Sequence, residues 1–261
     1  MKMLGLSVIM SAVLLLAGCV SNQANPQREL ATSSDQTDSQ KRAGLRLQLA
    51  IGYYEQRQFE VALDEIKQAL HANPNFAEAY SVRALIYMEM GEMSLADENF
   101  QHALRFAPNN PDFNNNYGWF LCNNGRAPQS IAYFERTLKN PTYQSPAKAL
   151  NNAGVCSLKT KDLAGAEKYF NEAFRFEPGN PAANANLAKL NYDRGNYDRA
   201  RFYVERAAKA EILSADVLWL AIKVEHKLGD RAAEASLVAQ LRRRHPASPE
   251  YAAFQRGAYD E

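Results

Sequence analysis

The stretch Ala77–Asn110, AEAYSVRALIYMEMGEMSLADENFQHALRFAPNN, decides the fold of this chain. Each half of it places apolar or small residues at i, i+4 and i+7, the spacing of one helix face. These sets are Tyr80, Ala84 and Tyr87, and then Ala96, Phe100 and Ala103. Gly91 separates the halves, and Pro108 stops the second because proline has no N–H to donate and clashes with the preceding turn. The stretch therefore predicts two antiparallel helices with small residues where they cross.

The same pattern recurs along the chain with a period of about thirty-four residues. The copies begin at Ala43, Ala77, Pro111, Ala147, Pro181 and Ala215, and the third is about two residues longer than the others. The sixth copy keeps only the outline, with Trp219, Gly229 and Pro246. One helix pair cannot bury both of its apolar stripes alone, so the copies must stack on one another. The spacings resemble the tetratricopeptide repeat, which implies an all-α superhelical solenoid of about six helix-turn-helix repeats.

Residues 43–248 are therefore expected to hold six tetratricopeptide (TPR) repeats. The predicted helix pairs are 43–56 and 59–71, 77–90 and 93–106, 111–123 and 127–138, 147–159 and 163–175, 181–193 and 197–209, and 215–227 and 231–243. Residues 249–261 are expected to form a capping helix and a tail. The helix, at Pro249–Gly257, would cover the apolar end of the stack, as terminal caps of repeat arrays do.

Residues 1–18 have the composition of a targeting segment. Lys2 supplies a positive start, and Leu4–Leu16 is an apolar run too short to span a bilayer comfortably. The run ends in Leu-Ala-Gly-Cys, which resembles the bacterial lipobox, where the cysteine (here Cys19) is lipidated and becomes the mature N-terminus. The next residue is Val20 rather than Asp, and the resemblance then implies the outer membrane rather than retention at the inner one. The alternative is an ordinary secretory signal peptide that happens to contain a cysteine.

The segment that follows Cys19 is polar. It is rich in Ser, Asn, Gln, Thr and Asp and has almost no apolar residues, so it cannot bury enough surface to offset its ordering entropy. We therefore expect residues 19–42 to form a lipidated N-terminus and a flexible tether. Several acyl chains, palmitate among them, would give an anchoring that one chain cannot.

Charge and motifs argue against nucleic-acid binding and catalysis. The formal net charge is +1, so there is no strongly basic field. None of the four histidines, His71, His102, His226 and His245, has a Cys or acid nearby at metal-ligand spacing. We find no nucleophile motif and no Gly-rich phosphate loop, so the chain is not expected to be an enzyme or to hold a cofactor. The run Arg242–Arg244 at a predicted helix end is typical of a solvated cluster that compensates the helix dipole, with a binding patch as the alternative.

A binding groove is the natural functional surface of a solenoid, and the first helices of the repeats form its inner face. In repeats of this type, positions 2, 5, 9 and 12 tend to face the groove. Across the first four repeats these positions supply an apolar strip of Ile51, Tyr54, Leu85, Met88, Trp119, Val155 and Leu158. The strip then becomes mixed or polar, with Lys189, Tyr192, Lys223 and His226. About half of these residues are expected to pack as core and half to line a groove for an amphipathic helix or an extended peptide. A clamp for peptide carboxylates is disfavoured, because only Lys148 offers a clear cation in the first four repeats.

Two cysteines, Cys122 and Cys156, lie thirty-four residues apart on the first helices of the third and fourth repeats. Adjacent first helices touch in this architecture, and a periplasmic location would be oxidising. With Cys19 consumed by lipid, the remaining count is even, which favours a disulfide. Two free buried thiols are the alternative. The cysteines occupy repeat positions that differ by two, so the repeat register alone does not show that the geometry of a disulfide is met.

Four short segments are more specific than a generic repeat. They are Asn115–Cys122 (NNYGWFLC), Ser130–Phe134 (SIAYF), Asn152–Cys156 (NAGVC) and Tyr251–Gln255 (YAAFQ). They resemble the type IV pilus biogenesis and stability lipoproteins, the PilF/PilW pilotins, and six repeats after a lipobox match that family as well.

The resemblance implies an outer-membrane lipoprotein that faces the periplasm. Such proteins help secretin subunits reach the outer membrane and assemble there, or stabilise pili. The implied partners are the type IV pilus secretin and other pilus biogenesis proteins, and the two cysteines of the family match Cys122 and Cys156. The chain departs from the repeat pattern at Glu234, where a small residue is expected. The alternative is a repeat lipoprotein that acts as a scaffold for other envelope machinery, such as cell-wall enzymes or β-barrel assembly.

Overall fold

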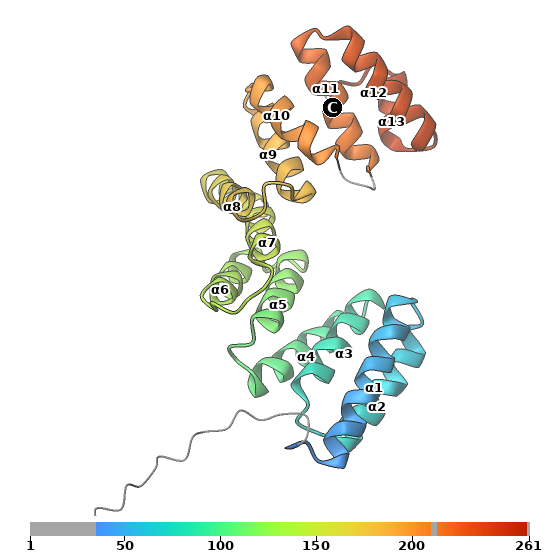
Figure 1. Cartoon of the computed structure of the whole chain (residues 1–261), viewed down its shortest axis with the longest axis vertical. Coiled ribbons are helices and arrows are strands. Elements are labelled where there is room, and N and C mark those ends of the chain that lie inside the picture. The colour runs from blue at the N-terminus through green and yellow to red at the C-terminus, as the bar shows by residue number, and fades with distance from the viewer. Residues whose placement is uncertain (1–34, 210–212, 260–261) are drawn as a thin grey trace, which may run out of the picture. The chain divides into compact units, whose positions relative to one another are not determined.

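The computed structural model describes residues 35–209 and 213–259 of the chain, and Figure 1 shows its helices. Within these ranges all regular secondary structure is helical. The helices are α1 (Asp38–Glu55), α2 (Phe59–Ala72), α3 (Ala77–Glu89), α4 (Met93–Phe106), α5 (Pro111–Asn123), α6 (Ala127–Leu138), α7 (Pro146–Lys159), α8 (Leu163–Phe176), α9 (Pro181–Asp193), α10 (Tyr197–Ala207), α11 (Ala215–Leu228), α12 (Arg231–Arg244) and α13 (Pro249–Gln255). The predicted all-α class, the six helix pairs and the short final helix are confirmed. The predicted signal peptide and lipidation site at Cys19 lie outside the described residues.

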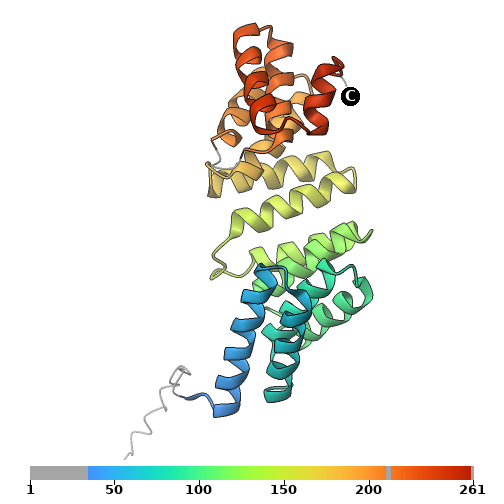
Figure 2. The same ribbon diagram turned by 90° about the vertical axis from the view of Figure 1, so that its right-hand side faces the viewer.

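The pairs stack in sequence order, as the two views of the ribbon show (Figures 1 and 2). Within the later repeats each first helix packs on its second, from α3 with α4 to α11 with α12. Each second helix then packs on the first helix of the following repeat, from α2 with α3 to α10 with α11. In the first repeat, Arg46 of α1 donates to Glu65 of α2 at 2.9 Å. No helix in the described part of the chain is long and apolar enough to cross a membrane.

The first helix begins earlier than its sequence predicts. The tether was expected to run to residue 42, but α1 starts at Asp38, so the prediction is wrong for residues 38–42. Asp38 lies in the first turn, where a negative charge favours the helix dipole. The hydroxyl of Ser39 donates to the carbonyl oxygen of Ala72 at 2.5 Å and so ties this turn to the end of α2. Residues 38–42 have no apolar periodicity that would predict a helix, and their helical turn is stabilised by a hydrogen bond to Ala72, thirty-three residues after Ser39.

Local signals fix most helix ends. Side chains of Asn110, Asp162, Asn180, Asp230 and Ser248 accept backbone N–H groups at helix starts. The turn inside each pair needs one residue with positive φ. Glycine supplies it in four repeats, at Gly91, Gly125, Gly195 and Gly229, while Arg57 (φ 59°) and Lys161 (φ 63°) occupy the same place in the first and fourth. Because a side chain disfavours this conformation, these two turns carry strain that the glycine turns avoid.

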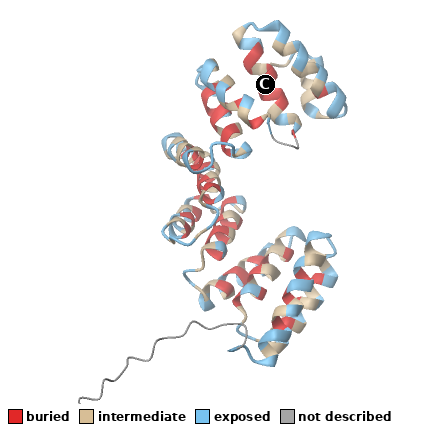
Figure 3. Ribbon diagram, viewed as in Figure 1, coloured by how far each residue is buried: buried red, intermediate tan, exposed pale blue. Residues whose placement is uncertain are grey.

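The core lies where the two helices of a pair cross. The twenty-fourth position of the first five repeats is a large apolar residue, and these residues, Ile66, Phe100, Phe134, Phe170 and Val204, are at most 1% exposed. Facing them are small residues on the first helices. A Cβ added at Gly118 would lie 2.9 Å from Phe134 Cε1, and one at Gly154 would lie 2.4 Å from Phe170 Cε1. The phenylalanine rings thus need glycine opposite them in the third and fourth repeats. Buried residues line the inward faces of the helices (Figure 3).

A final helix covers part of the C-terminal end of the stack. Tyr251 and Phe254 of α13 pack against a cluster that includes Leu218 and Trp219 of α11 and Leu241 of α12. The predicted capping helix is therefore present, although it ends at Gln255, two residues before the predicted Gly257.

Candidate partner-binding groove

The seven predicted groove residues lie on four first helices. Ile51 and Tyr54 are on α1, Leu85 and Met88 on α3, and Trp119 on α5, while Val155 and Leu158 are on α7. Ile51 is 36% exposed, and the other six are half-buried. These six also pack against core clusters: Tyr54 beside Ile66, Leu85 and Met88 beside Phe100, Trp119 beside Phe134, and Val155 and Leu158 beside Phe170. The expected division into core residues and groove residues does not occur among them, because each of the six has a packed side and an open side.

The disulfide joins the first helices of the third and fourth repeats. Cys122 of α5 and Cys156 of α7 are bonded, with their Cα atoms 5.7 Å apart. The two-position offset is accommodated because α5 and α7 pack directly against each other. Both cysteines are buried, and Trp119, one helical turn before Cys122, packs against the same cluster. The disulfide therefore fixes the part of the strip that Trp119 and Val155 occupy.

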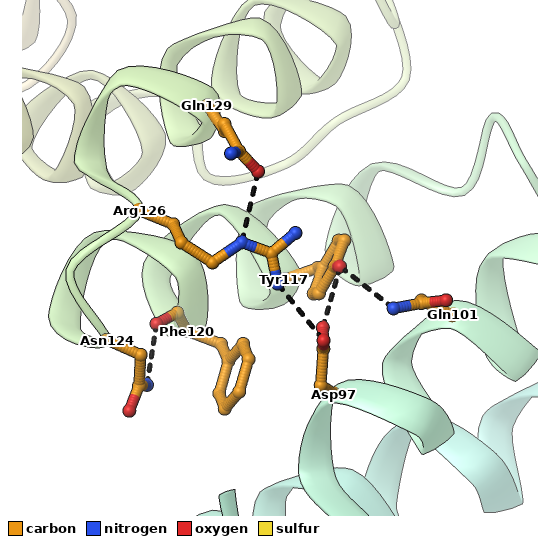
Figure 4. A network of polar contacts seen from close by, with 7 residues as sticks. All are labelled: Asp97, Gln101, Tyr117, Phe120, Asn124, Arg126 and Gln129. Carbon is orange, nitrogen blue, oxygen red and sulfur yellow. Dashed lines mark hydrogen bonds and ion pairs between the residues drawn. The ribbon is translucent and has the colours of Figure 1, made fainter. Parts of the chain in front are cut away.

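A polar network links the second repeat to the third (Figure 4). The Tyr117 hydroxyl donates to Asp97 Oδ1 at 2.7 Å, and Arg126 Nη1 donates to Asp97 Oδ2 at 3.0 Å. Gln101 Nε2 lies 3.4 Å from the same hydroxyl, and Arg126 Nε donates to Gln129. Burial, followed by the hydrogen bond to Asp97, raises the pKa of Tyr117 to about 12. The neutral hydroxyl thus bridges α4 and α5 throughout the physiological pH range.

Other repeat junctions have comparable polar links. Tyr169 donates to Glu135 at 3.3 Å between the fourth and third repeats. Arg194 pairs with Glu167 at 2.7 Å between the fifth and fourth. Arg201 of α10 pairs with the buried carboxylate of Glu225 on α11. These pairs orient each repeat on the one before it, so the curvature of the groove is set by contacts between residues that are distant in sequence.

Amide pairs that the sequence analysis did not identify link the first helices of the third, fourth and fifth repeats. Asn152 Nδ2 donates to Asn115 Oδ1 at 3.2 Å, and Asn186 Nδ2 donates to Asn151 Oδ1 at 2.9 Å. Lys159 Nζ contacts Asn123 Oδ1 at 2.7 Å. Asparagine at matching positions of successive first helices was the signal available in the sequence. The first helices of the third to fifth repeats are thus joined by polar contacts as well as by apolar packing.

The fifth and sixth repeats have the mixed character that the sequence indicates. Lys189 pairs with Asp193 at 2.7 Å, and the Lys223 ammonium lies 5.2 Å from the ring centroid of Tyr192. A cavity of about 330 Å³ lies here, with Trp219 among its lining residues. In the described part of the chain no group of three or more His, Cys, Asp or Glu side chains could hold a metal ion.

Three of the four histidines make structural contacts. His102 stacks on Tyr80 with ring centroids 4.9 Å apart, and His226 stacks on Tyr259 at 3.8 Å. His245 Nε2 lies 2.8 Å from the carbonyl oxygen of Leu213.

Stacked helix pairs with this spacing define a tetratricopeptide-repeat protein. Tetratricopeptide repeat families match residues 47–111 and 118–181, 99–132, and 157–217 of the chain. The chain is 30% identical over 240 residues to the type IV pilus assembly protein PilF of Pseudomonas aeruginosa, covering 92% of this chain and 93% of that protein. It therefore belongs to the family of PilF, a family of type IV pilus biogenesis proteins.

Two solved structures agree with this assignment. The crystal structure of PilW, described as a widely conserved type IV pilus biogenesis factor, is 34% identical with a TM-score of 0.74, covering 82% of this chain and 98% of that one. The structure of Pseudomonas aeruginosa PilF is 29% identical with a TM-score of 0.77, covering 85% of this chain and all of that one (100%). Together with the sequence match they make this chain a TPR protein of type IV pilus biogenesis.

Proposed function

We propose that this protein is a pilotin: a lipoprotein of the outer membrane, facing the periplasm, that binds secretin subunits of the type IV pilus and promotes their localisation and assembly. Membership of the PilF family supports the pilus pathway. The observation that supports binding is the apolar strip on the first helices of the first four repeats. Its side chains are held in place by core packing on one side and remain open on the other. Such a preorganised apolar surface suits an amphipathic or extended segment of a partner.

Trp119 is the residue on which secretin binding is expected to depend most. It lies near the middle of the strip, half-buried, and the Cys122–Cys156 disulfide holds the helices around it. Large aromatic residues near the centre of an interface often cost about 2 kcal/mol or more when truncated, on the order of a thirty-fold loss of affinity. We therefore expect Trp119→Ala to weaken secretin binding by about that factor.

The experiment compares Trp119→Ala with Phe176→Ala. Phe176 is 65% exposed at the end of α8, a second helix, so its truncation removes apolar surface outside the strip. Secretin multimer yield in cells and the melting temperature of the purified protein are measured for both variants. A loss of multimers with Trp119→Ala alone, beyond what its change in melting explains, supports the groove. Normal multimers with Trp119→Ala would remove this residue from the binding surface.

The location is tested separately at Cys19. We propose that this residue carries the lipid, because it follows a short apolar run in a lipobox-like sequence. Cys19→Ser should release the protein from the outer-membrane fraction without changing the melting of the folded repeats. If the variant still sediments with the outer membrane, the lipid anchor is refuted, whereas the groove proposal is unaffected.

A further inference from the structure

The sixth repeat leaves uncovered a surface that every earlier repeat buries. At the twenty-fourth position, Val204 of the fifth repeat is 1% exposed because Leu220, Ala221 and Val224 of α11 pack over it. The corresponding residues of the first four repeats are likewise covered by the first helix of the next repeat. In the sixth repeat the equivalent residue is Val238, and it is only half-buried. Leu241 is the sole buried residue of α12.

The reason is the length of the capping helix. α13 has 7 residues, compared with 14 in α11 and 13 in α9, so it covers only the first part of the slot that a seventh repeat would fill. Past α13, the hydroxyl of Tyr259 donates to Glu234 at 2.7 Å. This contact explains why Glu234 replaces the small residue of the other repeats. A cavity of about 720 Å³ remains beside this contact.

The cavity has an apolar floor and a basic rim. Its lining includes Ala235, Val238 and Ala239 of α12, Phe254 and Tyr259 from the C-terminal segment, and the arginines Arg231 and Arg242. The acid in the lining, Glu234, is engaged by the Tyr259 hydroxyl and by His226 Nδ1 at 3.1 Å. The fixed charge that remains at the rim is positive.

We propose that this cavity, formed by the open half of the seventh-repeat slot, is a second docking site that receives an acidic amphipathic helix of a partner protein. The earlier repeats show what covers such a surface: a helix that presents small and apolar residues at i, i+3 and i+4. They also show how charge is matched, because the buried carboxylate of Glu225 on the incoming α11 pairs with Arg201 on the second helix α10. The residue of α12 at the place of Arg201 is Ala235, and the two arginines that line the cavity, Arg231 and Arg242, lie one turn before it and two turns after it. A partner helix with carboxylates level with these arginines would be matched in charge. The site is separate from the groove and does not rest on the proposed pilotin role.

A second copy of this chain is a less suitable occupant. Its α1 does expose apolar residues, Leu45 at 63% and Leu49 at 47%. However, Lys41 and Arg42 on the same helix would bring further cations to a rim that is already basic. Charge therefore favours an acidic helix from a different protein.

The binding test uses the full mature protein and a helical peptide based on residues 222–228, the part of α11 that corresponds to the open half of the slot, acetylated, amidated and made acidic by Lys223→Glu and Lys227→Glu. We expect micromolar binding that falls at least tenfold with Ala239→Glu and with Arg242→Glu. Matched controls lie on the same helix: Ala232→Glu and Arg243→Glu change exposed residues that do not line the cavity. The same peptide with lysine at all three acidic positions should lose binding to the unmodified protein and regain it on a variant with both Arg231→Glu and Arg242→Glu. No binding of the acidic peptide, or equal losses in the matched controls, would overturn the proposal.

The natural occupant is tested in cells by placing a photo-crosslinking amino acid at Ala239 or at Ala232. We expect an adduct at position 239 alone, whose crosslinked peptide maps to an acidic helical segment of another protein. An adduct with a second copy of this chain, or equal adducts at both positions, would refute the inference. Trp119→Ala should leave the position-239 adduct unchanged, so this site and the groove can fail independently.

Discussion

Replacing Gly154 by alanine is the sharpest test of how the middle of the array packs. A Cβ at this position would lie 2.4 Å from Cε1, 2.6 Å from Cδ1 and 2.9 Å from Cζ of Phe170. Phe170 is fully buried among Ala166, Leu187 and their neighbours, so the ring has no open space to enter. Inserting a methyl into a well-packed core costs about 1–3 kcal/mol, and contacts this short place the substitution at the upper end.

Helix propensity acts in the opposite direction. Alanine is favoured over glycine in a helix interior by about 1 kcal/mol. Subtracting this from an overpacking cost of about 3 kcal/mol leaves a net destabilisation of about 2 kcal/mol. For a unit of this size that corresponds to a melting temperature lower by roughly 4–8 °C.

Gly52→Ala is the matched control, because it makes the same chemical change in a first helix where a Cβ would have nothing within 4 Å. We expect it to raise the free energy of unfolding by up to about 1 kcal/mol. Urea unfolding followed by circular dichroism measures both variants, and hydrogen exchange localises the loss to α7 and α8. Gly118→Ala should fall between them, since its closest contact, with Phe134, would be 2.9 Å. If Gly154→Ala is as stable as the unmodified protein while Gly52→Ala gains stability, the packing argument is refuted.

Three further predictions concern the links within and between repeats. Reducing the Cys122–Cys156 disulfide, or replacing both cysteines by alanine, should lower the free energy of unfolding by roughly 3–4 kcal/mol in the chain-entropy model. Denaturation with and without reductant measures this loss. Two alkylatable thiols in the protein isolated from the periplasm would contradict the bond. An unfolded tyrosine ionises near pH 10, whereas Tyr117 in the folded protein keeps its proton to about pH 12, so the stability from its neutral hydroxyl is present below pH 10 and is lost as pH rises to about 12. Tyr117→Phe should weaken this alkaline loss without abolishing it, because burial also raises the pKa of Tyr143, Tyr169 and Tyr259 to about 12; an unchanged pH profile would disprove the role of Tyr117. Lys161→Gly should relieve the strain of the left-handed turn, where φ is 63°, and raise the free energy of unfolding by about 1 kcal/mol. Lys168→Gly inside α8 is the control and should lower it by about as much. Equal losses in the two variants would show that the turn is not strained.

The sequence alone determined the repeat architecture and most helix boundaries. These features depend on signals within a few residues of each position, such as Pro111 at the start of α5, Gly91 in the turn after α3, and the i, i+4, i+7 spacing of small residues. Because the spacing repeats about every thirty-four residues, an uncertain boundary in one copy is fixed by the others. The pairing of Cys122 with Cys156 was favoured by the repeat as well, since it places the first helices of neighbouring repeats in contact, but the two-position offset left its geometry to the tertiary structure.

Only the tertiary structure decided the features that depend on residues distant in sequence. α1 begins at Asp38 because the Ser39 hydroxyl donates a hydrogen bond to the carbonyl oxygen of Ala72, and no local periodicity in the sequence predicts this contact. Glu234 departs from the repeat pattern because Tyr259, twenty-five residues later, donates to it. The open slot beside α12 likewise follows from the length of α13, which ends after two turns and leaves Val238 half-buried. Repetition in a sequence predicts how each repeat packs on the next, but the surface at the end of the array depends on whichever chain segment happens to reach it.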